Sequence, residues 1–531
     1  MASWFARNEP RLEIDVARAV KLNNADEWII VTTVVAAARS AGRQTAGSPE
    51  VIPPAFLAPE VSVERVMDVT PTLKPRAAGV PMVDLSVVPE ADEGYTLAIR
   101  HLSGALTFHG ADLETEQPRE GSAAATRFRF RVTLRRGGAV SDRPGVVGAA
   151  VKLILLKVSR KILDALLPSL AAEAESALWK IAGLSEGWFK LDEASLRSGK
   201  LQRGAPSGPG PSNRTLLFLH GALSDAASAF KGLVDTQFFA QLRPLYGEEM
   251  YALNHFTVSK TPEENARDLL AGLPNREISF DVITHSRGGL VLRTLVERKS
   301  ALGAIASRFK LRHGVLVASP NDGTALATPN RWESMVGWFA NLLELFPDGP
   351  LTFGAGFVAN AIVWIAQRAA GALPGIASMD AAGDTIAELQ APPPPPASGY
   401  SALVSNFTPT GNILERMADV GIDAFFGNAN DLVVPSAGGW LTDRAEGPLF
   451  IAPERIGCFG AGGNFPSRVP EVNHLNFFGR AETATFLVQA LNGTPHGLSR
   501  IDPSLPLPDS WSRRSGATAI AAVAPPIAPS V

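Results

Sequence analysis

The sequence predicts an α/β protein: a mostly parallel sheet flanked by helices, with a helical cap insertion and a smaller β-rich domain at the N-terminus. Three observations predict this class. Apolar runs such as Thr215 to Leu219 and Phe280 to Ile283 are typical of buried parallel strands. The segment from Gly289 to Val296 follows the second run with the spacing of an amphipathic helix. Alternating apolar and polar residues recur in the first part of the chain.

Residues 1–145 are expected to form the β-rich domain, because period-2 patterns such as Tyr95 to Arg100 and Arg127 to Leu134 are separated by turn residues. The alternating arginines of the second stretch favour a half-buried strand with a solvated basic face over a platform for nucleic acid. From Val146 to about Leu184 the apolar positions recur at helical spacing. Residues 146–213 are therefore expected to be a helical connector that ends in a glycine- and proline-rich linker.

Bulk properties exclude several function classes. A formal net charge of −3 gives no electrostatic reason to expect nucleic-acid binding. The single cysteine, Cys458, excludes an intrachain disulfide. Neither zinc-type Cys/His spacing nor a phosphate-binding glycine loop occurs, so we expect no cofactor and no metal. The first twenty residues lack the order of a secretory signal, and the apolar stretch Trp28 to Ala38 is too short to span a bilayer. These features predict a cytoplasmic protein, and leave peripheral membrane contact open.

A candidate nucleophile lies in the segment 214–498, which we expect to be the catalytic domain. Ser286 follows the strand Phe280 to Ile283 and precedes the helix that starts near Arg287. A serine at such a sharp strand-to-helix turn projects its hydroxyl above the sheet edge, and small residues must stand nearby. The pattern is Thr284-His285-Ser286-Arg287-Gly288, in which threonine replaces the usual first glycine. A surface serine in a strand–helix connection is the alternative.

A serine hydroxyl needs a base and an acid that orients the base. We prefer His474 as the base, because it opens the apolar helix Leu475 to Leu491, whereas His496 follows in a helix-ending turn. Asp431 is the predicted acid, since it stands in a loop after the apolar run Ala424 to Phe426. Asp423, before that run, and Asp322, after the strand Val315 to Ala318, are its competitors.

A negative oxygen formed during acyl transfer must be held by backbone N–H groups. We expect one donor at Arg287, directly after the nucleophile. The other should be Ala222, in the turn that follows the strand Thr215 to Leu219. His220, in the same turn, is expected to be a structural hydrogen-bonding residue.

An apolar insertion at about residues 330–390 is predicted to form a cap over these groups. It is rich in aromatic residues, namely Trp332, Trp338, Phe339, Phe346, Phe353, Phe357 and Trp364. The alternative is a second helical layer that only completes the core. The tail, residues 499–531, has an alanine- and proline-rich composition typical of disorder.

The segment from about Arg214 to Gly493 resembles the lipase and esterase branch of the α/β-hydrolases. The resemblance rests on His220 to Asp225, the serine turn, Ala318 to Thr324 and Asn428 to Pro435, in the chain order Ser…Asp…His. It implies a serine carboxylester hydrolase with Ser286, Asp431 and His474 as its triad and Ala222 and Arg287 as oxyanion donors. An apolar or lipid-like ester is the implied substrate. An amidase or acyltransferase with the same triad, or a binding module that lost catalysis, are the alternatives.

Overall fold

The structure is a computed structural model of the chain. It describes residues 12–14, 20–22, 29–36, 61–71, 82–87, 94–101, 103–115, 126–133, 151–158, 175–176, 179–180, 182–207, 214–328, 332–346, 373–391, 399–409, 411–420, 430–442, 451–460 and 472–493. The predicted tail 499–531 and the competitors His496 and Asp423 lie outside these residues.

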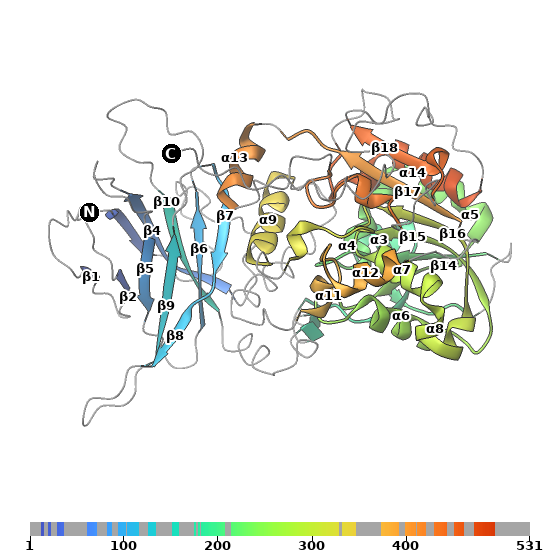
Figure 1. Ribbon diagram of the computed structural model, residues 1–531, viewed down its shortest axis with the longest axis horizontal. Helices are drawn as coiled ribbons and strands as arrows, with labels where there is room; N and C mark the ends of the chain where they lie inside the picture. The colour runs from blue at the N-terminus through green and yellow to red at the C-terminus, as the bar shows by residue number, and fades with distance from the viewer. Residues whose placement is uncertain are drawn as a thin grey trace.

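The N-terminal part is β-rich, as predicted, and consists of two antiparallel sheets that lie together in Figure 1. One has the order β1 (Leu12–Ile14), β2 (Val20–Leu22), β5 (Met82–Val87), β9 (Thr126–Thr133) and β8 (Asp112–Thr115). The other has the order β3 (Ile29–Ala36), β4 (Val61–Pro71), β10 (Val151–Val158), β6 (Gly94–Arg100) and β7 (Leu106–His109). Side chains of β5, β6, β9 and β10 share one apolar core between the sheets.

Strand β10 differs from the helix expected over Val146 to Leu184. It pairs with both β4 and β6 and is therefore a central strand. Leu153 and Leu155 point into the core between the two sheets, whereas Ile154 and Leu156 point into a second core on the opposite face. A strand buried on both faces has a continuous apolar run, and periodicity alone does not distinguish such a run from a buried helix.

The C-terminal part is an α/β unit around a mixed sheet of eight strands. Their order is β12 (Gln202–Arg203), β11 (Gly187–Lys190), β14 (Met250–Asn254), β13 (Thr215–Leu219), β15 (Ile278–His285), β16 (Phe309–Val317), β17 (Tyr400–Asn406) and β18 (Ile456–Gly460). The six strands from β14 to β18 in this order are parallel to one another. Strand β11 is antiparallel to both of its neighbours, β14 and β12. The prediction of an α/β class with a mostly parallel sheet is confirmed at this level.

Helices cover both faces of this sheet, which explains why every residue of the central strand β13 is buried. On one face, α4 (Ala226–Phe230), α5 (Phe238–Tyr246) and α14 (Ala481–Leu491) pack against Leu216 and Phe218 of β13. On the other face, α6 (Pro262–Ala271) and α7 (Gly288–Glu297) pack against Leu217 and Leu219 of the same strand. Alternate side chains of one strand therefore serve opposite cores.

Between the two parts lie α9 (Trp332–Leu345) and α13 (Gly411–Val420), as Figure 1 shows. Both contact β7, the edge strand of the second N-terminal sheet. Two short helices, α11 (Pro374–Ala377) and α12 (Asp384–Gln390), lie on the side of the α/β unit. The helix α9 thus belongs to one apolar core with the sheet and with the loops at the carboxyl ends of the parallel strands.

Candidate functional site

The predicted nucleophile, Ser286, lies at a strained turn. Strand β15 ends at His285, helix α7 begins at Gly288, and the backbone of Ser286 has φ +51°. A residue with a side chain adopts this left-handed conformation only where its surroundings impose it, at a cost of about 1–3 kcal/mol. Here the N–H of Ser286 donates to the carbonyl of Val317 at 2.9 Å, and the Ser286 carbonyl accepts from Gly289 at 3.0 Å.

Two glycines after Ser286 allow this turn to fit against the sheet. A Cβ atom on Gly288 would stand 2.3 Å from the carbonyl oxygen of Leu219, and one on Gly289 would stand 2.1 Å from Ser319 Oγ. Thr284, which replaces the usual glycine two residues before the serine, is buried, and its hydroxyl donates to the Val315 carbonyl at 3.2 Å. The departure of Thr284 from the expected pattern is therefore accommodated by a buried hydrogen bond.

Asp431 and His474 form a buried pair. The Nδ1 atom of His474 lies 2.9 Å from Asp431 Oδ2, and the backbone N–H of His474 donates to the Asp431 carbonyl at 2.8 Å. The other carboxylate oxygen, Oδ1, accepts the N–H groups of Val433 and Val434 at 3.0 and 2.7 Å. Because a carboxylate only accepts, His474 Nδ1 carries the proton, and in the neutral ring the lone pair is on Nε2.

Ser286 and His474 stand in two different loops and share no direct hydrogen bond. Neither Ser286 Oγ nor His474 Nε2 has a hydrogen-bond partner among the described residues. The connection between the loops is made by His285, whose Nε2 atom lies 3.0 Å from the backbone carbonyl of His474. The two imidazole rings have centroids 5.0 Å apart.

His285 is a site residue that the sequence reasoning treated only as part of the turn. Burial, and next the neighbouring His474, lower the pKa of His285 to about 3, so its ring is neutral near pH 7. Its Nε2 atom faces a carbonyl and must therefore carry the proton and donate it. A histidine directly before a strained serine was the available sequence signal, but its partner lies 189 positions away.

The loop after β13 lies directly against the nucleophile. A Cβ atom on Gly221 would stand 2.7 Å from Ser286 Cβ. The backbone N–H groups of Ala222 and Arg287, the two predicted donors, have no acceptor among the described residues, whereas the N–H of Leu223 is bonded to Thr257 Oγ1 at 3.0 Å. The structure thus brings both predicted donor residues beside Ser286 and leaves their N–H groups available.

His220 stabilises this loop by hydrogen bonds at both nitrogens of its ring. Its Nε2 atom accepts the backbone N–H of His255 at 3.2 Å, and its Nδ1 atom contacts the Gly221 carbonyl at 3.0 Å. Burial lowers the pKa of His220 to about 3. A neutral ring that accepts at one nitrogen must donate at the other, so His220 stabilises the turn, in agreement with the structural role expected for it.

The side chain of Arg287 has a role that the sequence did not indicate. It is fully buried and donates to the Gly375 carbonyl and to Asn265 Oδ1, both at 2.9 Å, and to the carbonyl of Lys260. Burial lowers its pKa to about 10, so it stays cationic near pH 7. One guanidinium therefore joins the serine turn to α6, to the segment before it and to α11.

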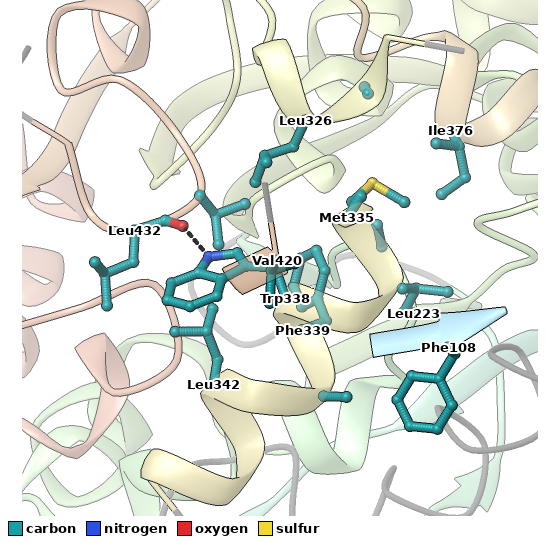
Figure 2. Packing of buried hydrophobic residues seen from close by; sticks show 14 of the residues in the cluster. Phe108, Leu223, Leu326, Met335, Trp338, Phe339, Leu342, Ile376, Val420 and Leu432 are labelled. Carbon is teal, nitrogen blue, oxygen red and sulfur yellow. Dashed lines mark hydrogen bonds between the residues drawn. The ribbon is translucent and has the colours of Figure 1, made fainter. Parts of the chain in front are cut away.

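The loops of the site share one apolar core with α9 and α11. Figure 2 shows part of this core, and Leu223, Leu432, Met335, Phe339 and Ile376 belong to it. The ring of Phe339 lies 6.4 Å from that of His474, edge to face. The exposed fractions of Ser286 and His474 are only 4% and 2%. Residues 347–372, in the middle of the predicted cap, lie outside the described residues, and Trp364 is among them.

The competing acid Asp322 does not hold the base, because the carboxylate on His474 Nδ1 is that of Asp431. In the described part of the chain, His, Cys, Asp and Glu side chains nowhere gather in threes that could bind a metal ion. Over the same residues, every helix is too short or too polar to cross a bilayer.

The chain belongs to the family described as "Domain of unknown function (DUF7379)", whose model matches residues 182–492. No curated protein matches the chain. Among solved structures it is similar to lipase 1 from Pelosinus fermentans, with 14% identity, a TM-score of 0.33, and coverage of 53% of this chain and 97% of that chain. A TM-score of this size does not allow residues of the two proteins to be equated.

Proposed function

We propose that the chain is a serine carboxylester hydrolase of the α/β-hydrolase type, with Ser286 as nucleophile, His474 as base and Asp431 as the orienting acid. The observation that carries the proposal is the buried Asp431–His474 pair, which a hydrogen bond from His285 joins to the turn of a serine in left-handed conformation. A serine with φ +51° at the end of a parallel strand is the geometry that exposes a hydroxyl above a sheet.

In the acylation step, His474 Nε2 takes the proton of Ser286 Oγ while Oγ forms a bond to the ester carbonyl carbon. The negative oxygen of the tetrahedral intermediate accepts from the N–H groups of Ala222 and Arg287. The intermediate collapses when its bond to the alcohol oxygen breaks, and that oxygen takes the proton from His474. Water then attacks the acyl-enzyme by the same proton transfers and releases the acid and Ser286.

The missing hydrogen bond between Ser286 and His474 is compatible with this mechanism, because such bonds often form only when substrate is bound. Asp431 keeps the proton on Nδ1 and stabilises the imidazolium that forms during each step.

An apolar acyl group suits this site better than a polar one. The oxyanion loop, the acid loop and the histidine loop contribute Leu223, Leu432 and Leu475 to one apolar core, and α9 adds Met335 and Phe339. Burial of each acyl methylene against such a surface contributes up to about 0.8 kcal/mol. A lipid-like ester is therefore the proposed substrate class, and an amidase or acyltransferase with the same triad is the second candidate.

A fluorophosphonate probe tests the proposal directly, because it reacts only with an activated serine. We expect stoichiometric labelling of Ser286, located by peptide mass spectrometry, and no labelling of Ser286→Ala or His474→Gln. The same variants should lose ester hydrolysis by several orders of magnitude while keeping the wild-type circular dichroism and melting temperature. An unlabelled Ser286 in folded wild-type protein, with no hydrolysis of any ester or amide, would favour a binding module without catalysis.

A further inference from the structure

Loop 430–435, which carries Asp431, has a backbone conformation that its residues do not favour by themselves. Leu432 has φ +81°, in the region where residues with side chains are strained. In this conformation the N–H groups of Val433 and Val434 donate to Asp431 Oδ1. The direction of the carboxylate therefore depends on what holds the carbonyl groups of the loop.

Each of three successive carbonyls in loop 430–435 has its own donor. The Val433 carbonyl accepts from Thr324 Oγ1 at 2.7 Å, and the Val434 carbonyl accepts from the N–H of Asp431 at 3.1 Å. The carbonyl of the strained residue, Leu432, accepts from Trp338 Nε1 at 2.6 Å, as Figure 2 shows. Trp338 and Leu432 are both fully buried, so water cannot replace the indole N–H.

Trp338 is held in turn by the N-terminal β-rich part. One turn further along α9, Asn341 Nδ2 donates to the Leu106 carbonyl and Asn341 Oδ1 accepts the Leu106 N–H, both at 2.8 Å. The amide of Asn341 thus pairs with edge strand β7 as a neighbouring strand would. Glu344, on the same helix, binds Arg100 of β6 at 2.6 Å and Arg416 of α13 at 3.3 Å.

We infer that Trp338 is a positioning residue for the proposed acid, and that α9 transmits the position of the N-terminal sheet to loop 430–435 through Asn341. The inference rests on the proposed function for its kinetic consequence, but the geometric part concerns only the Asp431–His474 pair. It assigns to residues 94–109 a role in setting up the site, although they contact neither Ser286 nor His474 in any described interaction.

Trp338→Phe in the full-length chain is the informative change, because it removes the indole N–H and keeps an aromatic ring. A misdirected carboxylate stabilises the imidazolium less well, so kcat for a short acyl ester should fall on the order of 10- to 100-fold, with KM within about twofold of wild type. The pH profile of kcat/KM should also change, because the hydrogen bond between Asp431 and His474 Nδ1 is altered. Asn341→Ala should act in the same direction with a smaller fall.

Trp188→Phe is the matched control. The indole of Trp188 also donates to a buried backbone carbonyl, that of Leu269 at 3.1 Å, but it lies in the core below α6. This variant should lose comparable thermal stability while it keeps wild-type kcat and pH profile. An equal loss of kcat in both tryptophan variants, or a Trp338→Phe enzyme with unchanged kcat and profile, would overturn the inference.

A second measurement does not depend on activity. In protein labelled with ¹⁵N-histidine, the Nδ1 proton bonded to Asp431 should give a low-field proton resonance that is absent in His474→Gln. The resonance should shift or broaden in Trp338→Phe and stay in place in Trp188→Phe. If wild type failed to hydrolyse esters or to react with the fluorophosphonate, the proposed function would fail, and this resonance would still decide whether Trp338 positions Asp431: an unshifted signal in Trp338→Phe contradicts the inference.

Discussion

The Nε2 atom of His285 lies 3.0 Å from the backbone carbonyl oxygen of His474. The residue that precedes the proposed nucleophile thus fixes the backbone of the proposed base, and the two loops cannot separate without losing a buried hydrogen bond. Since the pKa of His285 is lowered to about 3, mainly by burial, this donor does not change its charge near neutral pH.

His285→Phe should therefore lower kcat about tenfold or more, because it leaves a buried carbonyl without a donor at a cost of about 1–3 kcal/mol. The pH dependence above about pH 5 should not change, because His285 does not titrate there. His285→Gln, which keeps a donor, should recover part of the activity. Steady-state kinetics between about pH 5 and pH 9 checks this prediction, and a pH profile that moves in His285→Phe would contradict it.

Gly221→Ala should disable the oxyanion side of the site. The new Cβ atom would stand 2.7 Å from Ser286 Cβ, so the loop with Ala222 must move away from the nucleophile. Loss of one oxyanion donor costs on the order of 100- to 1000-fold in kcat. Gly479→Ala is the control, because a Cβ atom there has no neighbour within 4 Å. Comparable kcat values in the two variants would show that Ala222 is not a donor.

The acids can be ranked by substitution. Asp431→Asn should reduce kcat by several orders of magnitude, since an amide at this position no longer stabilises the imidazolium and can favour the wrong tautomer. Asp322→Asn should have a small effect, because the carboxylate on His474 Nδ1 is that of Asp431. Kinetics of both variants at matched thermal stability checks the ranking, and the reverse order would move the acid to Asp322.

The acyl preference should depend on α9. Met335→Ala enlarges the apolar core beside the site loops, so the preferred acyl chain should lengthen, with each added buried methylene contributing up to about 0.8 kcal/mol to transition-state binding. Measurement of kcat/KM over a series of acyl esters gives the preference directly. Leu302→Ala, a truncation in the core on the far side of α7, is the control. An identical preference in wild type and Met335→Ala would favour a helical layer that only completes the core.

The free energy of unfolding should decrease in acid, because the protein contains buried neutral histidines. Burial lowers the pKa values of His220 and His285 from 6.5 to about 3, so between these values the unfolded chain binds more protons than the folded one. The free energy of unfolding is therefore unaffected by these histidines above about pH 6.5 and decreases as the pH falls towards 3. At pH 5, each histidine has lowered the free energy of unfolding by about 2 kcal/mol. Urea unfolding near pH 7.5 and pH 5 should show a smaller difference for His220→Asn than for wild type. Equal pH dependence of the two proteins would contradict this prediction.

The sequence predicted the α/β class from the chain order of its elements. It also predicted, from chain order and local turn chemistry, which residues the structure gathers at the carboxyl ends of the parallel strands. Two contacts could not be predicted from the sequence, because they join residues that are far apart in it. His285 and His474 are 189 positions apart, and Asn341 and Leu106 are 235 positions apart. Strand β10 was mistaken for a helix because it is apolar on both faces. The run Ala424 to Phe426, used to locate the acid, lies outside the described residues, whereas the last described strand before Asp431 is β17.

Glu175 lies before the segment that matches the family model, yet it binds a loop inside that segment. The family match begins at residue 182, yet the buried carboxylate of Glu175 accepts the backbone N–H groups of Thr257, Val258 and Ser259 at 2.9, 3.1 and 2.7 Å. A fragment cut at the boundary would leave these three donors without their acceptor, next to the hydroxyl of Thr257 that bonds the N–H of Leu223. It would also remove Leu106, which pairs with Asn341, and Arg100, which binds Glu344. The smallest piece of this protein suited to expression and enzymology therefore starts upstream of the sequence that defines its family.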